Sequence, residues 1–217
     1  MVLFDSAIAL LQDLLTFFYG VTVSLGMANY GIAIILITLV IKLALYPLTV
    51  KQVKGMKAMQ DLQPKMKDLQ EKYKGNAEKL NKEMALLYKD SGVNPLAGCL
   101  PLLVQMPILM GIFFAIRDYQ YAHLPSFLWI ADLSGPDPLY ILPILSAITT
   151  YVQQKQTSTD MNQQTKMMMN FMPLFIGYIS ITFPGGLVLY WVVSNLFQIA
   201  QQWWMYRESA VNKGEAN

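Results

Sequence analysis

The sequence carries a lysine, Lys42, inside the apolar run "ITLVIKLALYP" at 37–47. A charge at the centre of a membrane-spanning helix costs roughly 2.5–3.5 kcal/mol on insertion scales, so it usually pairs with an opposite charge or faces water. The other apolar runs that we assign to spans contain no Asp or Glu that could neutralise it. We therefore expect Lys42 to line a hydrated cavity. The alternative is a side chain that snorkels to the interface without a function.

Polar side chains in the other apolar runs could line the same cavity. They gather toward the ends of the runs that we place on the cytoplasmic side, which favours a groove open to the cytoplasm and closed outside. Each could instead form a helix–helix hydrogen bond, typically worth about 0.6 kcal/mol. Three of them, Asn195, Gln198 and Gln202, share one helical face. The candidate groove residues beside Lys42 are Gln105, Ser146, Thr150, Ser194, Asn195, Gln198 and Gln202.

The sequence does not favour catalysis. An intramembrane protease needs a Ser–His pair or two aspartates within the spans, but the only histidine, His123, falls in a predicted outer loop. The only cysteine, Cys99, allows no disulfide framework, and the ligands for a metal site are too few. We predict neither an enzyme, a cofactor nor a bound metal.

The composition is typical of an integral membrane protein. Of 217 residues, 54% are apolar and 14% charged, against about a quarter charged in soluble domains. A helix needs roughly 20 residues to cross the hydrocarbon core. The apolar windows predict an all-α integral membrane fold, a bundle of five transmembrane helices at 30–49, 95–116, 139–152, 169–183 and 187–205. The third and fourth windows are short, as expected where the bilayer is thinned.

The placement of Lys and Arg predicts the orientation of the chain. Fourteen of them fall at 50–94, in the loop 153–168 and in the tail 206–217, which five spans place on one side. The outer loop at 117–138 carries Arg117 alone. Because positive charge collects in cytoplasmic loops, we place the N-terminus outside and the C-terminus in the cytoplasm.

The N-terminal segment 1–29 contains a further apolar window at 7–25. Gln12 and Asp13 oppose an apolar face, which predicts an amphipathic helix lying in the outer interface. A sixth span is the alternative, but it would place the N-terminus inside, where no positive charge holds it. The start, "MVLFDSAIALL", lacks a positive n-region, so we expect no cleavable signal peptide.

The segment 50–94 has the pattern of a helical hairpin. Apolar residues from Met59 to Tyr73 repeat three and four apart, "KGN" at 74–76 interrupts them, and the pattern resumes at Leu80. Pro64 can kink or restart the first helix. The lysines of this hairpin either form a solvated face near anionic lipid or a docking surface for a ribosome or targeting factor. The candidate contact residues are Lys65, Lys67, Lys72, Lys74 and Lys79.

Three separate stretches carry a resemblance to a known family. They are "TLVIKLALYPLTVKQVKGMKAMQDLQPKM", "NPLAGCLPLLVQMPILMGIFFAI" and "FPGGLVLYWVVSNLFQIAQQ". Together they resemble the YidC/Oxa/Alb family of membrane-protein insertases, in a bacterial form. The resemblance implies a protein of the bacterial cytoplasmic membrane that inserts nascent membrane-protein clients, holding their polar segments in a hydrophilic groove. It also implies insertion alone or beside the Sec translocon. With the hairpin lysines, the candidate partners are the Sec translocon, the ribosome, the signal recognition particle pathway and anionic lipids, and no specific nucleic acid.

The sequence departs from the family in three ways. The family's groove usually carries an arginine where this chain has Lys42, and a lysine is a point charge that keeps the attraction for acidic segments but not bidentate binding. No large outer domain lies between an N-terminal span and the core, and the tail is short and not strongly basic. The alternative function is a small membrane channel or transporter, for which we see neither an internal repeat nor a second charge.

Overall fold

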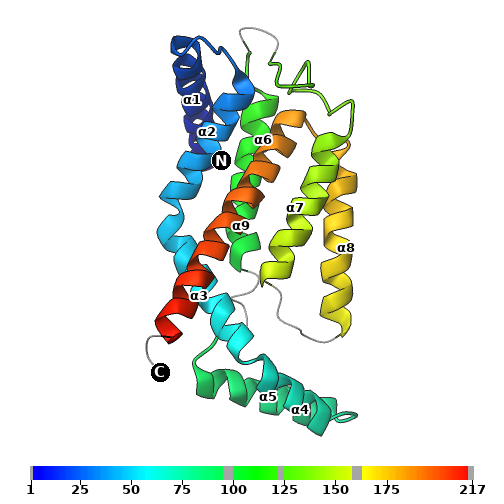
Figure 1. The fold of residues 1–217 in the computed structure, drawn as a ribbon. Coiled ribbons are helices and arrows are strands. Elements are labelled where there is room, and N and C mark those ends of the chain that lie inside the picture. The colour runs from blue at the N-terminus through cyan, green and yellow to red at the C-terminus, as the bar shows by residue number, and fades with distance from the viewer. Residues whose placement is uncertain (1, 95–99, 122–124, 158–162, 215–217) are drawn as a thin grey trace.

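The computed structural model describes residues 2–94, 100–121, 125–157 and 163–214, which form nine helices (Figure 1). The all-α part of the predicted fold class is confirmed. Cys99, His123 and residues 158–162 lie outside the described residues. The helices are α1 (Val2–Ser24), α2 (Tyr30–Ala44), α3 (Tyr46–Asp61), α4 (Gln63–Lys72), α5 (Ala77–Ser91), α6 (Leu100–Arg117), α7 (Ile141–Thr157), α8 (Gln163–Ser180) and α9 (Gly185–Gly214).

Helix α9 is the centre of the bundle. It contacts α2, α6 and α7, and in Figure 1 it crosses in front of α6. Helix α8 packs on α7, and α1 packs on α2 and α6. Polar side chains that α9 turns inward can therefore contact three other helices of the bundle.

The first predicted span, 30–49, is not one straight helix. Helix α2 ends at Ala44, and α3 begins at Tyr46 in a direction that differs by 66°. Pro47 lies in the first turn of α3, where it has no N–H to donate and where its ring would clash with the Leu43 carbonyl of a continuous helix. The bend therefore lies about one turn beyond Lys42.

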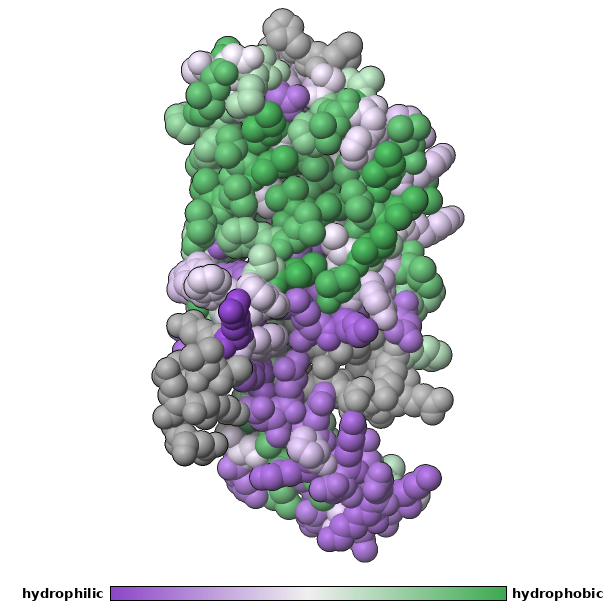
Figure 2. All heavy atoms as spheres, in the orientation of Figure 1, coloured by the Kyte–Doolittle hydropathy of each residue, from purple (hydrophilic) through white to green (hydrophobic). Residues whose placement is uncertain are grey.

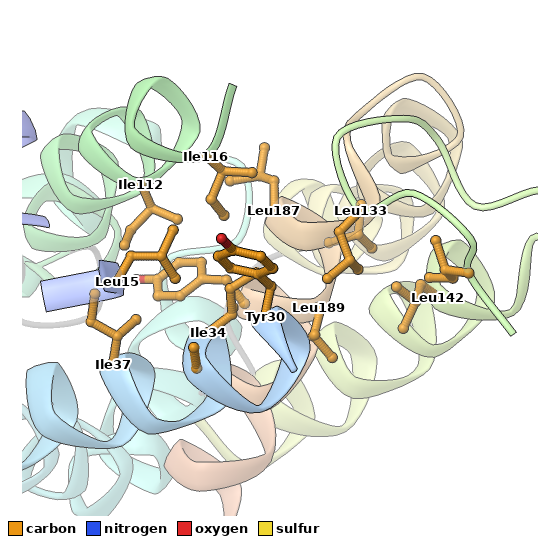
Figure 3. Packing of buried hydrophobic residues seen from close by; sticks show 14 residues of the cluster. Leu15, Tyr30, Ile34, Ile37, Ile112, Ile116, Leu133, Leu142, Leu187 and Leu189 are labelled. Atoms are coloured by element: carbon orange, nitrogen blue, oxygen red, sulfur yellow. The ribbon is translucent and has the colours of Figure 1, made fainter. Parts of the chain in front are cut away.

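The upper half of the bundle in Figure 1 is an apolar core. Tyr30, Ile34 and Ile37 of α2 point toward α6 and α9 (Figure 3). Tyr30 stacks on Tyr19 of α1 with ring centroids 3.9 Å apart. We call this cluster the outer core, and its fully buried members also include Leu15, Ile112, Ile116, Ile130, Leu133, Leu142, Leu187 and Val188.

The segment between α6 and α7 closes this end of the bundle. The Gly185 and Gly186 amides at the start of α9 donate to the carbonyls of Gly135 and Leu133, at 2.6 and 2.9 Å. The buried Asp137 carboxylate accepts the Leu142 amide at 2.7 Å and the Trp129 indole N–H at 3.0 Å. Asp137 thereby supplies acceptors to the first turn of α7, whose amides have no partner within the helix.

The outward-facing sides of the bundle helices are apolar. Leu103 of α6, Ile148 of α7 and Leu174 of α8 are 64%, 52% and 70% exposed, and Figure 2 shows a wide apolar band above a hydrophilic lower part. An apolar surface of this extent is typical of a protein embedded in lipid. By length and hydropathy, α1 over Phe4–Ser24 is the one described helix able to span alone, and the bent α2–α3 pair would add a second.

Helix α1 differs in one respect from the amphipathic pattern read from the sequence. Leu15 is buried against the bundle, as expected for the apolar face. Gln12, expected on the polar face, instead lies toward α6, where its amide N–H donates to the Ala115 carbonyl at 3.5 Å. The exposed face also carries Leu10 and Phe17, at 59% and 63% exposure. The sequence pattern could not show this because the contact depends on a distant helix.

Helices α4 and α5 form the lowest part of Figure 1 and pack against each other. The Asn76 side chain accepts the Lys79 amide and caps α5. Met66 is buried beside Tyr88, and burial raises the pKa of the Tyr88 hydroxyl above its ordinary value. This segment is held together by a small hydrophobic cluster that is separate from the outer core. The cluster consists of Met59, Leu62, Met66, Met84, Leu87, Tyr88 and Val93.

Candidate functional site

Lys42 is buried in the lower half of the bundle. Its side chain is 7% exposed, and its Nζ donates a hydrogen bond of 3.2 Å to Oε1 of Gln198 on α9. Among the described residues, no carboxylate lies within ion-pair distance of this ammonium. The charge is therefore solvated by a neutral amide, which is a weaker partner than a carboxylate and easier to exchange.

A pocket of about 150 Å³, lined by six polar and three apolar side chains, lies beside this pair, between α6, α7, α8 and α9. Gln198 lines it and so stands between the pocket and Lys42, which is not itself among the lining residues. We call it the groove pocket, and its lining consists of Gln105, Thr150, Gln153, Gln154, Met172, Ile176, Trp191, Asn195 and Gln198.

Hydrogen bonds from α9 hold the groove pocket in shape. The Asn195 amide nitrogen donates to the Thr149 and Thr150 hydroxyl oxygens of α7, at 3.2 and 3.0 Å. The Trp191 indole N–H donates to Thr150 at 3.0 Å. On the other side, the Gln105 amide of α6 donates to the Tyr190 hydroxyl at 2.9 Å. One helix thus fixes the positions of polar groups on two others.

The structure brings together some of the predicted groove residues and not others. Gln105, Thr150, Asn195 and Gln198 line the groove pocket, and Lys42 contacts it through Gln198. Ser146 lies elsewhere. Its hydroxyl is fully buried between α7 and α8, where it is 3.0 Å from the Ser180 hydroxyl.

Ser194 and Gln202 are buried on α9 without lining the groove pocket. Gln202 has no exposed surface, and neither atom of its amide has a hydrogen-bond partner in the part of the chain that is described. Buried amides nearly always find a partner in protein or in water. Because Gln202 follows Gln198 by one helical turn, it marks a second polar position next to the Lys42 pair.

Some pocket residues were not predicted from the sequence. Trp191 lines the pocket, and Tyr190 accepts the hydrogen bond from the lining residue Gln105. Each carries one polar atom on a large apolar ring, and such atoms need a partner when buried. That need could have pointed to them. Met172 and Ile176 could not be predicted as lining residues, because the sequence of an apolar span does not show which of its apolar side chains face the pocket.

The predicted hairpin lysines form a separate site. All five, Lys65, Lys67, Lys72, Lys74 and Lys79, are exposed on α4, α5 and the turn between them. The hydrophilic lower part of Figure 2 contains this segment. Asp68, Glu71 and Glu78 are exposed among them, so the surface is of mixed charge. In the residues that the structure covers, no group of three or more His, Cys, Asp or Glu side chains could hold a metal ion.

An all-helical bundle with an apolar outward surface and a buried cation beside the groove pocket defines the class as a helical membrane protein. The chain belongs to the 60Kd inner membrane protein family, whose family model matches residues 22–213. The resemblance to the YidC proteins drawn from the sequence is confirmed by this match and by the relatives.

Several relatives carry the name membrane protein insertase YidC. The chain is 46% identical over 184 residues to the one from Citrifermentans bemidjiense, covering 84% of this chain and 34% of the relative. It is 48% identical over 180 residues to that of Alkalihalophilus pseudofirmus, covering 80% and 71%. It is 46% identical over 196 residues to that of Haemophilus influenzae strain KW20 Rd, covering 89% and 35%. The chain thus spans about a third of the length of two of these relatives.

The fold is also similar to a solved structure, described as an active YidC insertase with the first transmembrane domain resolved. The TM-score is 0.70 at 30% sequence identity, and the match covers 88% of this chain and 45% of the other. The similarity extends over nearly the whole bundle described above.

Proposed function

We propose that this protein is a membrane-protein insertase and chaperone, which inserts newly synthesised membrane proteins and helps them fold. One observation carries the proposal: a buried ammonium, Lys42, is held by a neutral amide beside a polar pocket, below an outer core that is apolar. The names of the relatives support the activity. The mechanism makes and breaks no covalent bond in the client, so it needs no catalytic residue and no cofactor.

We propose five transmembrane spans, formed by α2 with the start of α3, α6, α7, α8 and α9 to about residue 205. In this arrangement α1 lies in the outer interface, 117–138 is an outer loop, and the N-terminus is outside. The hairpin 50–94, the loop 153–168 and the tail 206–217 lie in the cytoplasm. The distribution of Lys and Arg supports this orientation, because fourteen of them fall on the proposed inner side.

The client's polar tail enters from the cytoplasmic end and pairs with Lys42. It takes the place of Gln198, whose amide is a modest partner for an ammonium. Water that bonds to the buried amide of Gln202 keeps the surroundings polar enough for the exchange. The membrane potential, about 2.3 kcal/mol per charge per 100 mV, draws an acidic tail outward.

The client's apolar helix leaves between α6 and α8. Gln105 of α6 and Met172 and Ile176 of α8 all line the groove pocket, so we place the exit to lipid between these two helices. Met106 and Met110 of α6 are 48% and 42% exposed there, and methionine adapts to many apolar shapes. Transfer of the client helix into lipid then drives its release.

The exposed hairpin lysines provide the contact with partners on the cytoplasmic side. They suit anionic lipid headgroups and the phosphates of a ribosome equally well, because both are recognised by charge. Delivery by the signal recognition particle pathway and action beside the Sec translocon fit the same surface.

Substitution of Lys42 tests the proposal. Lys42→Glu places a carboxylate where an acidic client tail should bind, so insertion of a client with an acidic outer tail should fall at least about tenfold, equivalent to 1.4 kcal/mol. The assay is protease protection of the client in cells depleted of their own insertase. A client with a neutral tail, inserted by the same variant, controls for folding. Normal insertion of the acidic-tailed client by stably expressed Lys42→Glu would contradict the electrostatic mechanism.

A further inference from the structure

A second pocket lies on the outer surface where α2 and α3 meet α9. Its volume is about 220 Å³, and it is lined by Leu43, Tyr46, Phe197, Ala200, Gln201, Trp204 and Met205. These α9 residues lie on a different helical face from Trp191, Asn195 and Gln198, which line the groove pocket. We call it the junction pocket, and the proposed passage of clients does not use it.

One polar side chain lines this otherwise apolar pocket. Gln201 is 9% exposed, and both atoms of its amide are buried without a hydrogen-bond partner among the described residues. A buried amide without a partner is costly, so such a group calls for a ligand that offers a donor or an acceptor. The ligand must also be mainly apolar, because the remaining lining is aliphatic, aromatic or thioether.

The rim of the junction pocket is aromatic, and two cations lie further along α3 and α9, against rings that do not line the pocket. Tyr46 and Trp204 are 46% and 66% exposed, as is usual for aromatic side chains at the level of lipid headgroups. Arg207 lies 5.4 Å above the Trp203 ring, and Lys57 lies 6.0 Å from the centre of the Tyr206 ring. Both cations lie beyond the pocket toward the proposed cytoplasmic side, and they would attract a negative headgroup.

The size of the junction pocket favours a chain over a helix. A helix with its side chains is about 10–12 Å wide, so it could place only individual side chains in a pocket of about 220 Å³. A single acyl chain is narrow enough to enter.

We propose that the junction pocket binds an anionic phospholipid of the cytoplasmic leaflet. An acyl chain lies along Leu43, Phe197 and Ala200, and the Gln201 amide hydrogen-bonds to the ester region. The headgroup phosphate lies toward Lys57 and Arg207. The bound lipid supplies the partner that the Gln201 amide lacks and fixes the bend between α2 and α3.

Binding of phosphatidylglycerol to the purified full chain tests this site without any client. Native mass spectrometry would follow lipid retained after delipidation and re-addition of palmitoyl-oleoyl phosphatidylglycerol or phosphatidylcholine. Ala200→Trp should fill the pocket and weaken retention of phosphatidylglycerol by about tenfold, comparable to losing the burial of about two methylene groups. Leu196→Trp is the matched control, because Leu196 is 52% exposed on the same helix and does not line the pocket.

Two further variants separate the parts of the proposal. Gln201→Leu should weaken retention severalfold, since it removes the hydrogen bonds to the lipid. A pocket without a lipid predicts the opposite, a higher melting temperature and unchanged retention. Lys57→Gln combined with Arg207→Gln should abolish the preference for phosphatidylglycerol over phosphatidylcholine. Equal retention by wild type and Ala200→Trp, or a dimer of this chain that Ala200→Trp dissociates, would overturn the proposal.

Discussion

The two ends of the bundle are built from the same helices but bury different kinds of side chain. On α2, Ile34 is buried among aliphatic and aromatic side chains, while Lys42, eight residues later, is buried against an amide. On α9, Val188 belongs to the outer core, whereas Gln198 lines the groove pocket. The side chains of the outer core are apolar and pack closely against one another. The other half, which we call the inner half, contains Lys42 and the groove pocket. It leaves the Gln202 amide without a partner among the described residues and the Lys42 ammonium with a neutral one.

This difference indicates a division of labour between stability and function. Helices in lipid associate by close van der Waals packing and hydrogen bonds rather than by escape from water, so the outer core holds the bundle together. In the proposed function, the inner half keeps polar groups available for a client. An apolar inner half would pack better but could not receive a charged tail. Substitutions in the outer core should therefore lower the free energy of unfolding, whereas apolar substitutions in the inner half should raise it and lower client insertion.

The largest loss of stability should follow truncation of the outer core. Ile34 is 1% exposed, so Ile34→Ala should lower the free energy of unfolding by about 2–5 kcal/mol. Thermal unfolding in detergent, followed by circular dichroism, measures the change. The matched control is Val40→Ala on the same helix, where the side chain is 41% exposed and the change should stay within about 0.5 kcal/mol. Equal effects of the two would contradict the special role of the outer core.

A smaller loss should follow the addition of one methyl group at Gly31. A Cβ atom there would overlap ring atoms of Phe127 and lie 2.6 Å from its Cβ, and the latter cannot move without the backbone. Gly31→Ala should destabilise the protein by about 1–3 kcal/mol through overpacking. Gly20→Ala, with nothing within 4 Å of the new atom, should be neutral or stabilising. A melting temperature of Gly31→Ala at or above that of wild type would show that this contact is not tight.

In the inner half, we expect a substitution to raise the free energy of unfolding instead of lowering it. Gln202→Leu removes two buried amide atoms that lack partners in the described chain, so it should raise the free energy of unfolding by about 1–2 kcal/mol. Insertion of acidic-tailed clients should fall in the same variant. Melting temperature and client insertion are measured on one preparation. A variant that is less stable, or as active as wild type, would contradict the idea that this amide serves a hydrated path.

The smallest effect should come from Lys42→Arg. Arginine keeps the positive charge at this position and adds donors, so insertion of acidic-tailed clients should remain within about threefold of wild type, or less than about 1 kcal/mol. The same protease-protection assay measures it beside Lys42→Glu. A loss as large as that caused by the carboxylate would show that shape, and not charge, governs this position.

Several residues that the sequence analysis named line the groove pocket, and their role stays a prediction, whereas the shape of the first predicted span was not predicted. Lys42 stood out because its charge had no partner in any other span, and Gln198 followed from helical spacing alone. The bend at Leu45 was not predicted, although Pro47 carried a local signal for it. The partner of Ser146 on α8 and the contact of Gln12 with Ala115 depend on which helices become neighbours. Local periodicity contains no information about that.

The most direct test of the account asks from which side water reaches the neighbourhood of Lys42. Single cysteines replace Gln198 or Ile34 in a Cys99→Ser background, and a membrane-impermeant maleimide is added to vesicles of known orientation. We predict that Gln198→Cys reacts from the cytoplasmic side only, while Ile34→Cys reacts from neither side. Labelling of Gln198→Cys from the outer side, or from neither, would contradict an inner half that is open to the cytoplasm beneath a closed outer core.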